Sequence, residues 1–273
     1  MSVDADTDAR AARDLLVSAA REAGALALEY FRPGGRTSAK VTAKAGGSPV
    51  TDADLAADSL LKRRLLEALP QAGWLSEETV DDFERLARRS LIVVDPIDGT
   101  RAFVTGDPRW VVSAALVVDG RPVAGVVHAP ALDETYAAAR GGGVTFNGAL
   151  LARVAAWPPR VAAGPRPIIE AMAEKIGHPV EVTPRIPALA YRLALAARGA
   201  IDFAVAAENS HDWDIAAADI LLEEAGARLI DASGERLRYN ARQVHRGALL
   251  AAPDAAAPRL IEAFRAAIGS RPN

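Results

Sequence analysis

The sequence predicts a mixed α/β protein, with a first half rich in antiparallel strands and a second half in which helices and strands alternate. Between about Asp8 and Phe31, apolar residues recur at spacings of three and four, as in an amphipathic helix. Further along, two apolar runs meet across Asp119-Gly120, which is a strong hairpin signal. Beyond about residue 167, helical and strand-like stretches alternate, as in α/β folds.

Two helices are predicted at the N-terminal end. The first runs from about Asp8 to Phe31 and stops at Pro33-Gly34-Gly35, and the second runs from about Asp52 to Leu69 and is closed by Pro70. Residues 37–49 between them are polar and contain glycine, so we expect a loop of unusual length. Loops of this kind often have a functional role.

Strand signals dominate the next part of the chain. We expect strands at residues 91–94, 111–118, 122–128, 135–139 and 144–146. The proline-rich segment from Ala152 to Pro167 is the best candidate for a boundary. It divides the chain into an N-terminal α+β half, residues 1–155, and a C-terminal α/β half, residues 156–273.

The C-terminal half alternates between the two kinds of element. Helices are expected near residues 168–176, 188–198, 215–225 and 258–268. Strands are expected near residues 201–206, 228–230 and 248–251.

Composition excludes several chemistries. The 273 residues include 32 Lys and Arg, 35 Asp and Glu, four His and no Cys. Without thiols there is no disulfide, no Cys-ligated metal and no cysteine nucleophile, which fits a reducing cytoplasm. A net charge of −3 with only short basic clusters argues against a nucleic-acid polymer as partner. The chain shows neither a secretory signal nor an apolar run near the ~18 residues of a membrane span, so we expect a soluble cytoplasmic protein without a membrane partner.

The most informative stretch is Val93-Val94-Asp95-Pro96-Ile97-Asp98-Gly99-Thr100. An apolar strand is expected to end at Asp95, because Pro96 cannot donate to a continuing ladder, and a turn would bring Asp98 back beside it. Two carboxylates that close would repel each other unless a cation lay between them, and Mg²⁺ is the natural cation for oxygen ligands. The alternative is a turn in which Asp98-Gly99 only makes local hydrogen bonds.

Three other elements carry carboxylates, and each has a structural alternative. Glu77 and Glu78 follow a short apolar run and could simply be exposed. Asp214 is expected at an N-cap and Gly226 at the C′ position of one helix. Thr51-Asp52-Ala53-Asp54 fits a capping box in which Thr51 and Asp54 serve the second helix.

An aspartyl-phosphate route is excluded by the spacing. Haloacid-dehalogenase phosphatases also carry Asp-Gly-Thr after an apolar strand, with a nucleophilic aspartate two residues before that aspartate. Pro96 occupies the corresponding position here, so the chain has no such nucleophile.

Taken together and in this order, Glu-Glu, Asp-Pro-Ile-Asp-Gly-Thr, and Trp-Asp before an Ala-rich helix ending in Glu-Ala-Gly resemble the inositol monophosphatase family. The resemblance covers nearly the whole chain. It implies a layered αβαβα sandwich and a magnesium-dependent, lithium-sensitive phosphatase in which metal-activated water attacks a small phosphate monoester. It also permits a homodimer.

The resemblance implies roles for particular residues. Two or three Mg²⁺ ions would be bound by four carboxylates and one backbone carbonyl, from Glu77, Asp95, Asp98, Asp214 and Ile97. Asp54 and Thr100 would orient the attacking water, and Glu77 belongs to the catalytic set as well. Asp98, Gly99 and Thr100 would contact the substrate, with free backbone N–H groups holding phosphate oxygens.

The resemblance leaves two substrates nearly balanced, an inositol monophosphate and 3′-phosphoadenosine 5′-phosphate. Arg192 falls where the bisphosphate nucleotidase branch has a phosphate-binding lysine. Glu208 lies one residue from the position of the inositol enzymes' substrate-binding glutamate, which is Ala207 here. His211 precedes Asp214 by three residues and is a further candidate for substrate contact. A catalytically weak member that acts by binding a regulatory protein partner is the alternative function.

Overall fold

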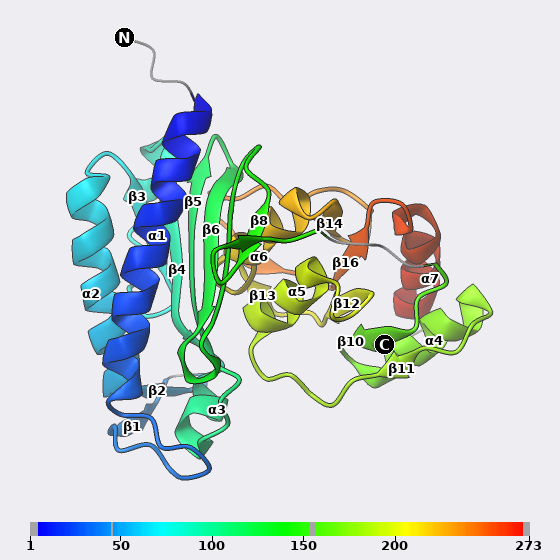
Figure 1. Ribbon diagram of the computed structural model, residues 1–273, viewed down its shortest axis with the longest axis horizontal. Coiled ribbons are helices and arrows are strands. Elements are labelled where there is room, and N and C mark those ends of the chain that lie inside the picture. Colours follow the sequence, from blue (N-terminus) through cyan, green and yellow to red (C-terminus); the bar gives the residue numbers. More distant parts are fainter. Residues whose placement is uncertain (1–4, 45, 153–156, 270–273) are drawn as a thin grey trace.

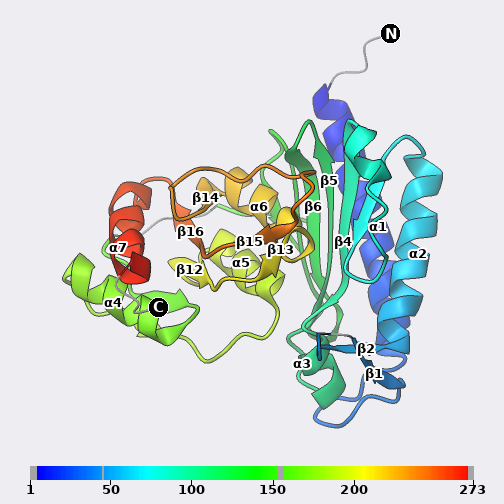
Figure 2. The same cartoon turned by 180° about the vertical axis from the view of Figure 1, so that it is seen from behind.

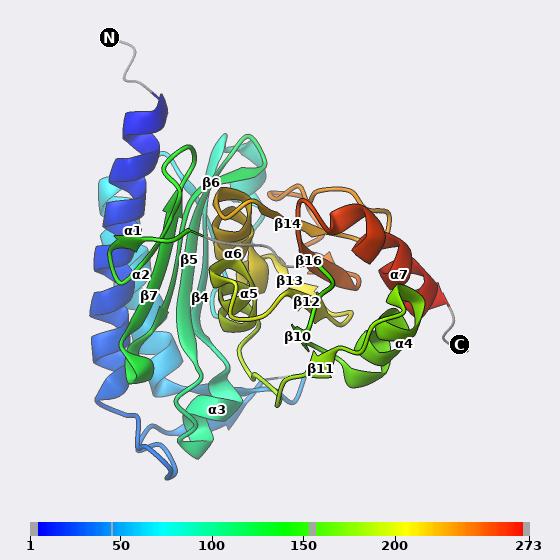
Figure 3. The same cartoon turned by 45° about the vertical axis from the view of Figure 1, so that its right-hand side comes forward.

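The computed structural model describes residues 5–44, 46–152 and 157–269, which form alternating layers of helices and sheets (Figure 1). In order, the layers are α1 (Ala5–Leu28) with α2 (Asp52–Ala68), a large sheet, α5 (Leu189–Arg198) with α6 (Asp212–Glu224), a second sheet, and α4 (Arg166–Ile176) with α7 (Ala257–Gly269). Figure 3 shows α5 and α6 between the two sheets. The expected αβαβα sandwich is confirmed.

The large sheet has the strand order β3-β4-β5-β6-β7-β8-β9. Its strands are β3 (Gly73–Ser76), β4 (Ser90–Asp98), β5 (Val111–Val118), β6 (Arg121–Ala129), β7 (Glu134–Ala139), β8 (Val144–Phe146) and β9 (Ala149–Leu150). Among the described strands of this sheet, only β3 and β4 pair in parallel. Along β4, Leu91 and Val93 pack toward α5 and α6, whereas Ile92 and Val94 pack toward α1 and α2. Because both faces are covered, residues 91–94 of this strand are all apolar instead of alternating with polar residues.

The second sheet has the strand order β11-β10-β12-β16-β14. Its strands are β11 (Glu181–Val182), β10 (Val161–Ala163), β12 (Phe203–Ala206), β16 (Leu249–Pro253) and β14 (Ala227–Ile230). The first three are parallel, and β16 runs antiparallel between β12 and β14. The predicted boundary between residues 155 and 156 lies outside the described residues, so the division into two domains stays a prediction.

The remaining elements are short, and a hairpin and a short helix among them lie near one end of the large sheet (Figure 2). The stretch expected to be a loop, residues 37–49, instead contributes to a hairpin of β1 (Val41–Ala43) and β2 (Pro49–Thr51). Strands this short are below the length at which an alternating pattern can be recognised in a sequence. Figure 2 shows this hairpin beside α3 (Thr100–Thr105). The strands β13 (Ser210–His211) and β15 (His245–Arg246) form a second small pair, and the 3-10 turns are Glu84–Ala87 and Pro130–Leu132.

Helix α6 lies close against β6 because Gly125 has no side chain. A Cβ atom at Gly125 would lie 2.6 Å from the Ile220 side chain and 2.8 Å from the Ala217 carbonyl oxygen. A larger residue would therefore push α6 away from the sheet. Since Asp214 is carried by α6, this contact helps to set the distance between Asp214 and the aspartates of β4.

Asp219 gives the protein a stability that depends on pH. It is buried in α6, where its Oδ2 accepts a 2.9 Å hydrogen bond from the Tyr239 hydroxyl. Burial raises the pKa of Asp219 to about 7 from an ordinary value of 3.8. Between these two values the folded state binds more protons than the unfolded state, so the free energy of unfolding contributed by this group falls as pH rises through the window.

We expect Asp219→Asn to remove this dependence, because the amide stays neutral and its oxygen can still accept from Tyr239. Relative to wild type, the variant should lose less stability between about pH 5 and about pH 7.5. Urea unfolding at several pH values in this range measures the difference. Parallel stability curves for the two proteins would contradict the assignment.

Candidate active site

Three aspartates converge where β4 meets the start of α6. Asp95, Asp98 and Asp214 each offer a carboxylate oxygen, and these oxygens lie within 4.8 Å of one another. Asp95 and Asp98 are buried, and Asp214 is half-buried. The fold thus brings together carboxylates from two motifs that are far apart in the sequence.

A backbone irregularity in β4 orients the first two carboxylates. The expectation that the strand ends at Asp95 is wrong: β4 continues to Asp98, and its register with β5 shifts between these two residues. Pro96 has no N–H to donate, so it is tolerated within this irregular stretch. The Ile97 N–H donates to Asp95 Oδ1 at 3.0 Å. An irregular stretch within the strand, and not a turn after it, therefore places the two carboxylates together.

One carboxylate oxygen of Asp98 and one of Asp214 accept hydrogen bonds from backbone N–H groups at the starts of helices. The Ala190 N–H at the start of α5 donates to Asp98 Oδ2 at 2.6 Å. The His211 N–H donates to Asp214 Oδ2 at 2.6 Å. The predicted N-cap is therefore wrong, because His211 is the N-cap of α6 and Asp214 occupies position N3 of its capping box. Gly226 does follow the C-cap in a left-handed conformation, with φ of 70°, as predicted.

The site is electrostatically strained without a cation. Burial, reinforced by Glu77, Asp98 and Asp214, raises the pKa of Asp95 well above its usual value. Burial and then Asp214 raise the pKa of Asp98 in the same way. Buried carboxylates that repel one another are stabilised by a bound cation, and hard divalent cations favour such oxygen ligands. The donor set therefore fits a divalent metal.

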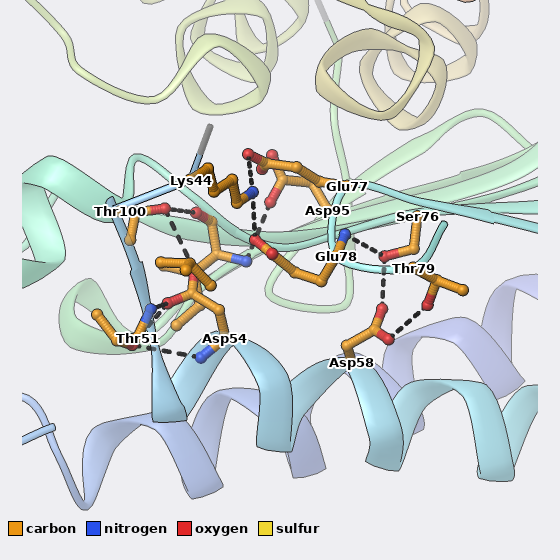
Figure 4. Close-up of polar contacts among 12 residues, drawn as sticks. Lys44, Thr51, Asp54, Asp58, Ser76, Glu77, Glu78, Thr79, Asp95 and Thr100 are labelled. Carbon is orange, nitrogen blue, oxygen red and sulfur yellow. Dashed lines mark hydrogen bonds and ion pairs between the residues drawn. The ribbon is translucent and has the colours of Figure 1, made fainter. Parts of the chain in front are cut away.

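Lys44 supplies the positive charge beside the glutamate pair (Figure 4). Its Nζ atom lies 2.7 Å from Glu77 Oε1 and 2.8 Å from Glu78 Oε1. Burial raises the pKa of Glu78 to about 7, against the lowering effect of its hydrogen bond to Lys44. The Lys44 ammonium group thus forms ion pairs with Glu77 and Glu78, next to the aspartate cluster.

Asp54 and Thr100 meet as the resemblance implies, although they lie on α2 and at the start of α3. Thr100 Oγ1 is 3.2 Å from Asp54 Oδ1 and 3.1 Å from the Ile97 carbonyl oxygen, and its single proton can serve either acceptor. The other oxygen of Asp54 accepts from the Thr51 N–H at 2.8 Å and the Thr51 hydroxyl at 2.6 Å, completing the predicted capping box. Burial raises the pKa of Asp54 to about 6.

Comparison with known proteins decides the family. A sequence model of the inositol monophosphatase family matches residues 8–268. The chain belongs to this family. It is 32% identical over 247 residues to the 3′(2′),5′-bisphosphate nucleotidase CysQ of Aggregatibacter actinomycetemcomitans, which covers 84% of this chain and 87% of that protein. It is 34% identical over 212 residues to a histidinol-phosphatase of Mycobacterium tuberculosis, covering 71% of this chain and 78% of that protein.

A solved structure of an inositol monophosphatase family member supports the same assignment. The Thermotoga maritima IMPase aligns with 94% of this chain and 97% of its own, with a TM-score of 0.78 and 26% identity. The family is metal-dependent, and the nucleotidase and the histidinol-phosphatase described above both remove phosphate groups. This family member is accordingly a phosphatase that acts on small phosphate monoesters, and the resemblance seen in the sequence is confirmed.

In this phosphatase, a second carboxylate of α2 supports the glutamate pair. Asp58, one helical turn after Asp54, accepts from the Ser76 hydroxyl at 2.5 Å and from the Thr79 hydroxyl at 2.8 Å. Ser76 Oγ in turn accepts from the Glu78 N–H at 3.3 Å. These contacts tie the strand end that carries Glu77 and Glu78 to α2 (Figure 4). The four-residue spacing from Asp54 was the only signal in the sequence that pointed to Asp58.

We expect Asp58→Leu to weaken metal binding, because Ser76 and Thr79 lose their acceptors and the segment that carries Glu77 loosens. Supporting residues of metal sites typically contribute about 10-fold to affinity or activity, and we expect a loss of this size in Mg²⁺ affinity. Isothermal titration with Mg²⁺ measures it. Asp52→Leu, at an exposed position in the same helix, is the matched control. Unchanged affinity in Asp58→Leu would show that Asp58 only stabilises the fold.

Gly99 is required where β4 passes into α3. Its φ angle is 91°, and a Cβ atom there would lie 3.3 Å from Ala188 Cβ and 3.4 Å from the Arg109 carbonyl oxygen. Glycine adopts this conformation without strain. It allows Thr100 to begin α3 directly beside the aspartates.

An open cleft leads to the carboxylates. It is lined by Ser48, Pro49, Glu77, Asp95, Asp98, Gly99, Thr100, Arg101, Arg185, Pro187 and Asp214. Within the described part of the chain, this lining does not include three residues for which substrate contact was predicted, Arg192, Glu208 and His211. Their roles stay predictions. The lining does include Arg185, to which no motif pointed.

The three residues with predicted substrate contacts that are not in the lining of the cleft make other contacts or are exposed. The His211 ring stacks on Trp213, with centroids 4.5 Å apart, and lies 4.1 Å from the His245 ring. Glu208 is exposed in the turn after β12. Arg192 lies in α5, and its Nε atom is buried without a hydrogen-bond partner among the described residues.

Proposed function

We propose that this phosphatase hydrolyses small phosphate monoesters with Mg²⁺ as its metal. The observation that carries the proposal is the convergence of three carboxylate oxygens within 4.8 Å on Asp95, Asp98 and Asp214. With Glu77 and the Ile97 carbonyl oxygen, they would hold two or three ions. When bound, Mg²⁺ lowers the pKa of water and neutralises charge on phosphate oxygens.

The chain's own groups would prepare the water for attack. The Thr100 hydroxyl can donate to Asp54 beside the metal ligands, and Thr51 donates to the other oxygen of Asp54 and holds it in place. A water molecule that donates to Thr100 Oγ1 would be held in one orientation, while the Thr100 proton is directed to Asp54. Because no aspartate stands at position 96, attack by water on phosphorus is direct and forms no phosphoenzyme.

Three kinds of substrate deserve comparison. The names of the relatives point to nucleotide 3′(2′),5′-bisphosphates, histidinol phosphate and inositol monophosphates. The compound 3′-phosphoadenosine 5′-phosphate belongs to the first kind. The first and third were expected from the motifs, and the second was not. All three are small phosphate monoesters, so the metal site can serve each of them, and the choice rests on the rest of the cleft.

Phosphate release from these three compounds, with Mg²⁺, with EDTA and with added Li⁺, tests the proposed function. We expect Mg²⁺-dependent release from at least one compound and inhibition by Li⁺. Release that is undiminished by EDTA, or no release from any small phosphate monoester, would overturn it.

The expected partners and location follow the same proposal. No helix in the described ranges combines the length and apolar character needed to cross a membrane. Action in the cytoplasm, assembly as a homodimer and the lack of a nucleic-acid partner stay predictions. Size-exclusion chromatography with light scattering tests the homodimer.

A further inference from the structure

The cleft is lined by side chains of both charges. Glu77, Asp95, Asp98 and Asp214 supply the negative charges, and Arg101 and Arg185 supply the positive ones. Arg101 is the second residue of α3, directly after Thr100, and Arg185 lies in the segment between β11 and α5. Two arginines from separate segments therefore face the same opening as the metal ligands.

Neither arginine is neutralised by the protein. Within the described ranges, the guanidinium groups of Arg101 and Arg185 form no ion pair or hydrogen bond, and both residues are exposed. Nearby Arg109 differs, because it is paired with Asp107 and its Nη1 donates to the Arg185 carbonyl oxygen at 2.9 Å. The Arg109 contact anchors the backbone of Arg185 and leaves the Arg185 side chain free for a ligand.

A third positive charge, outside the lining of the cleft, interacts with residues that line it. Arg192 interacts electrostatically with both Asp98 and Arg185, and its buried Nε atom has no partner within the described residues. A buried guanidinium that is not fully paired adds to the positive potential at the cleft. The scissile phosphate would be served by the metal ions, so the two exposed arginines are available for another part of the substrate.

We propose that Arg101 and Arg185 bind a second anionic group, so that the preferred substrates are phosphate monoesters that carry another phosphate. This proposal rests on the proposed function and selects among its substrates. Guanidinium groups bind phosphate through strong, charge-assisted pairs of hydrogen bonds. The neutral ring of an inositol monophosphate gains nothing from them, and the cationic amine of histidinol phosphate is repelled.

Turnover of four substrates tests the proposal. The bisphosphates are 3′-phosphoadenosine 5′-phosphate and fructose 1,6-bisphosphate, which distinguish a nucleotide from a sugar, and the monophosphates are inositol 1-phosphate and histidinol phosphate. We expect kcat/KM for at least one bisphosphate to exceed both monophosphates by about 10-fold or more, since charge-assisted pairs are strong. A wild-type preference for either monophosphate would overturn the proposal without touching the proposed function.

Variants of the two arginines test whether they cause the preference for bisphosphates. In Arg185→Gln and Arg101→Gln, the ratio of bisphosphate to monophosphate kcat/KM should fall by about 10-fold, mainly through KM. Arg63→Gln removes the same charge from an exposed position on α2, where Arg63 has no ion-pair partner among the described residues, and should leave the ratio unchanged. An equal loss on every substrate would assign the arginines to the scissile phosphate or to folding, and would overturn the proposal.

A binding measurement separates this proposal from catalysis. Titration of a bisphosphate into Thr100→Val with Mg²⁺ should give a lower Kd than titration of inositol 1-phosphate, and adding Arg185→Gln should remove the difference. Equal affinities for the two ligands would overturn the proposal even if turnover is seen. If the wild type releases no phosphate at all, the proposed function fails, and this titration still decides whether the arginines bind the second anion.

Discussion

Asp95→Asn should abolish phosphate release while making the metal-free protein more stable. Asp95 is 1% exposed, and burial together with Glu77, Asp98 and Asp214 disfavours its charge. An amide of the same shape removes this repulsion, and its oxygen can still accept from the Ile97 N–H. The amide is a much poorer ligand for Mg²⁺ than a carboxylate. Activity and metal-free stability therefore change in opposite directions.

Thermal unfolding with EDTA and with Mg²⁺, together with phosphate release, measures both effects. Wild-type Tm should rise on adding Mg²⁺, because a ligand that binds the folded state stabilises it. In Asp95→Asn, the Tm in EDTA should be higher than in wild type and the shift with Mg²⁺ should be smaller. Asp219→Asn also removes a buried carboxylate but lies outside the cleft, so it is the matched control for turnover and for the Tm shift with Mg²⁺, both of which it should leave unchanged. Normal turnover in Asp95→Asn would contradict the metal assignment.

Thr100→Val should lower kcat by about 10²-fold or more, in the range that positioned proton-transfer groups contribute. Valine keeps the shape of threonine but removes the hydroxyl that links Asp54 to the site. Metal affinity should change little, because the proposed metal set includes no Thr100 oxygen. Substrate affinity should also change little, because the backbone N–H of residue 100, which would contact the phosphate, is retained. The loss would therefore fall on kcat and not on KM.

Steady-state kinetics with saturating Mg²⁺, combined with Mg²⁺ titration by calorimetry, measures this separation. Thr100→Ser restores the hydroxyl and should recover most of kcat. A Thr100→Val protein that turns over at the wild-type rate would show that the Asp54–Thr100 pair does not orient water. A variant that fails to bind Mg²⁺ would instead give Thr100 a role in building the metal site.

Local signals predicted the elements whose structure depends on near neighbours. The β5–β6 hairpin turns at Asp119-Gly120 as expected, and α2 begins with the Thr51 and Asp54 capping box. Such features need only a few consecutive residues, so their physics is contained in the sequence of the segment. Asp54 of this capping box also accepts a hydrogen bond from Thr100, a contact that the local pattern alone left open.

The predictions that the structure contradicts concern residues whose geometry depends on a partner segment. Pairing with β5 carries β4 past Pro96, and the resulting register shift orients Asp95 and Asp98. The α6 helix begins earlier than its apolar pattern indicates, since the His211 N–H bonds to the Asp214 carboxylate and places Asp214 inside the helix. In the same way, no pattern pointed to Arg185, because a surface arginine gains meaning only from the cleft that it lines.

The sequence by itself determined the family, the layered fold class and the carboxylate types available for a metal. These depend on residue identity, spacing and periodicity. Only the tertiary structure decided that oxygens from Asp95, Asp98 and Asp214 lie within 4.8 Å, that Asp58 supports the glutamate pair, and that two unpaired arginines share the cleft. Those relations join residues from different layers, and their distances are set by how helices and sheets pack against one another.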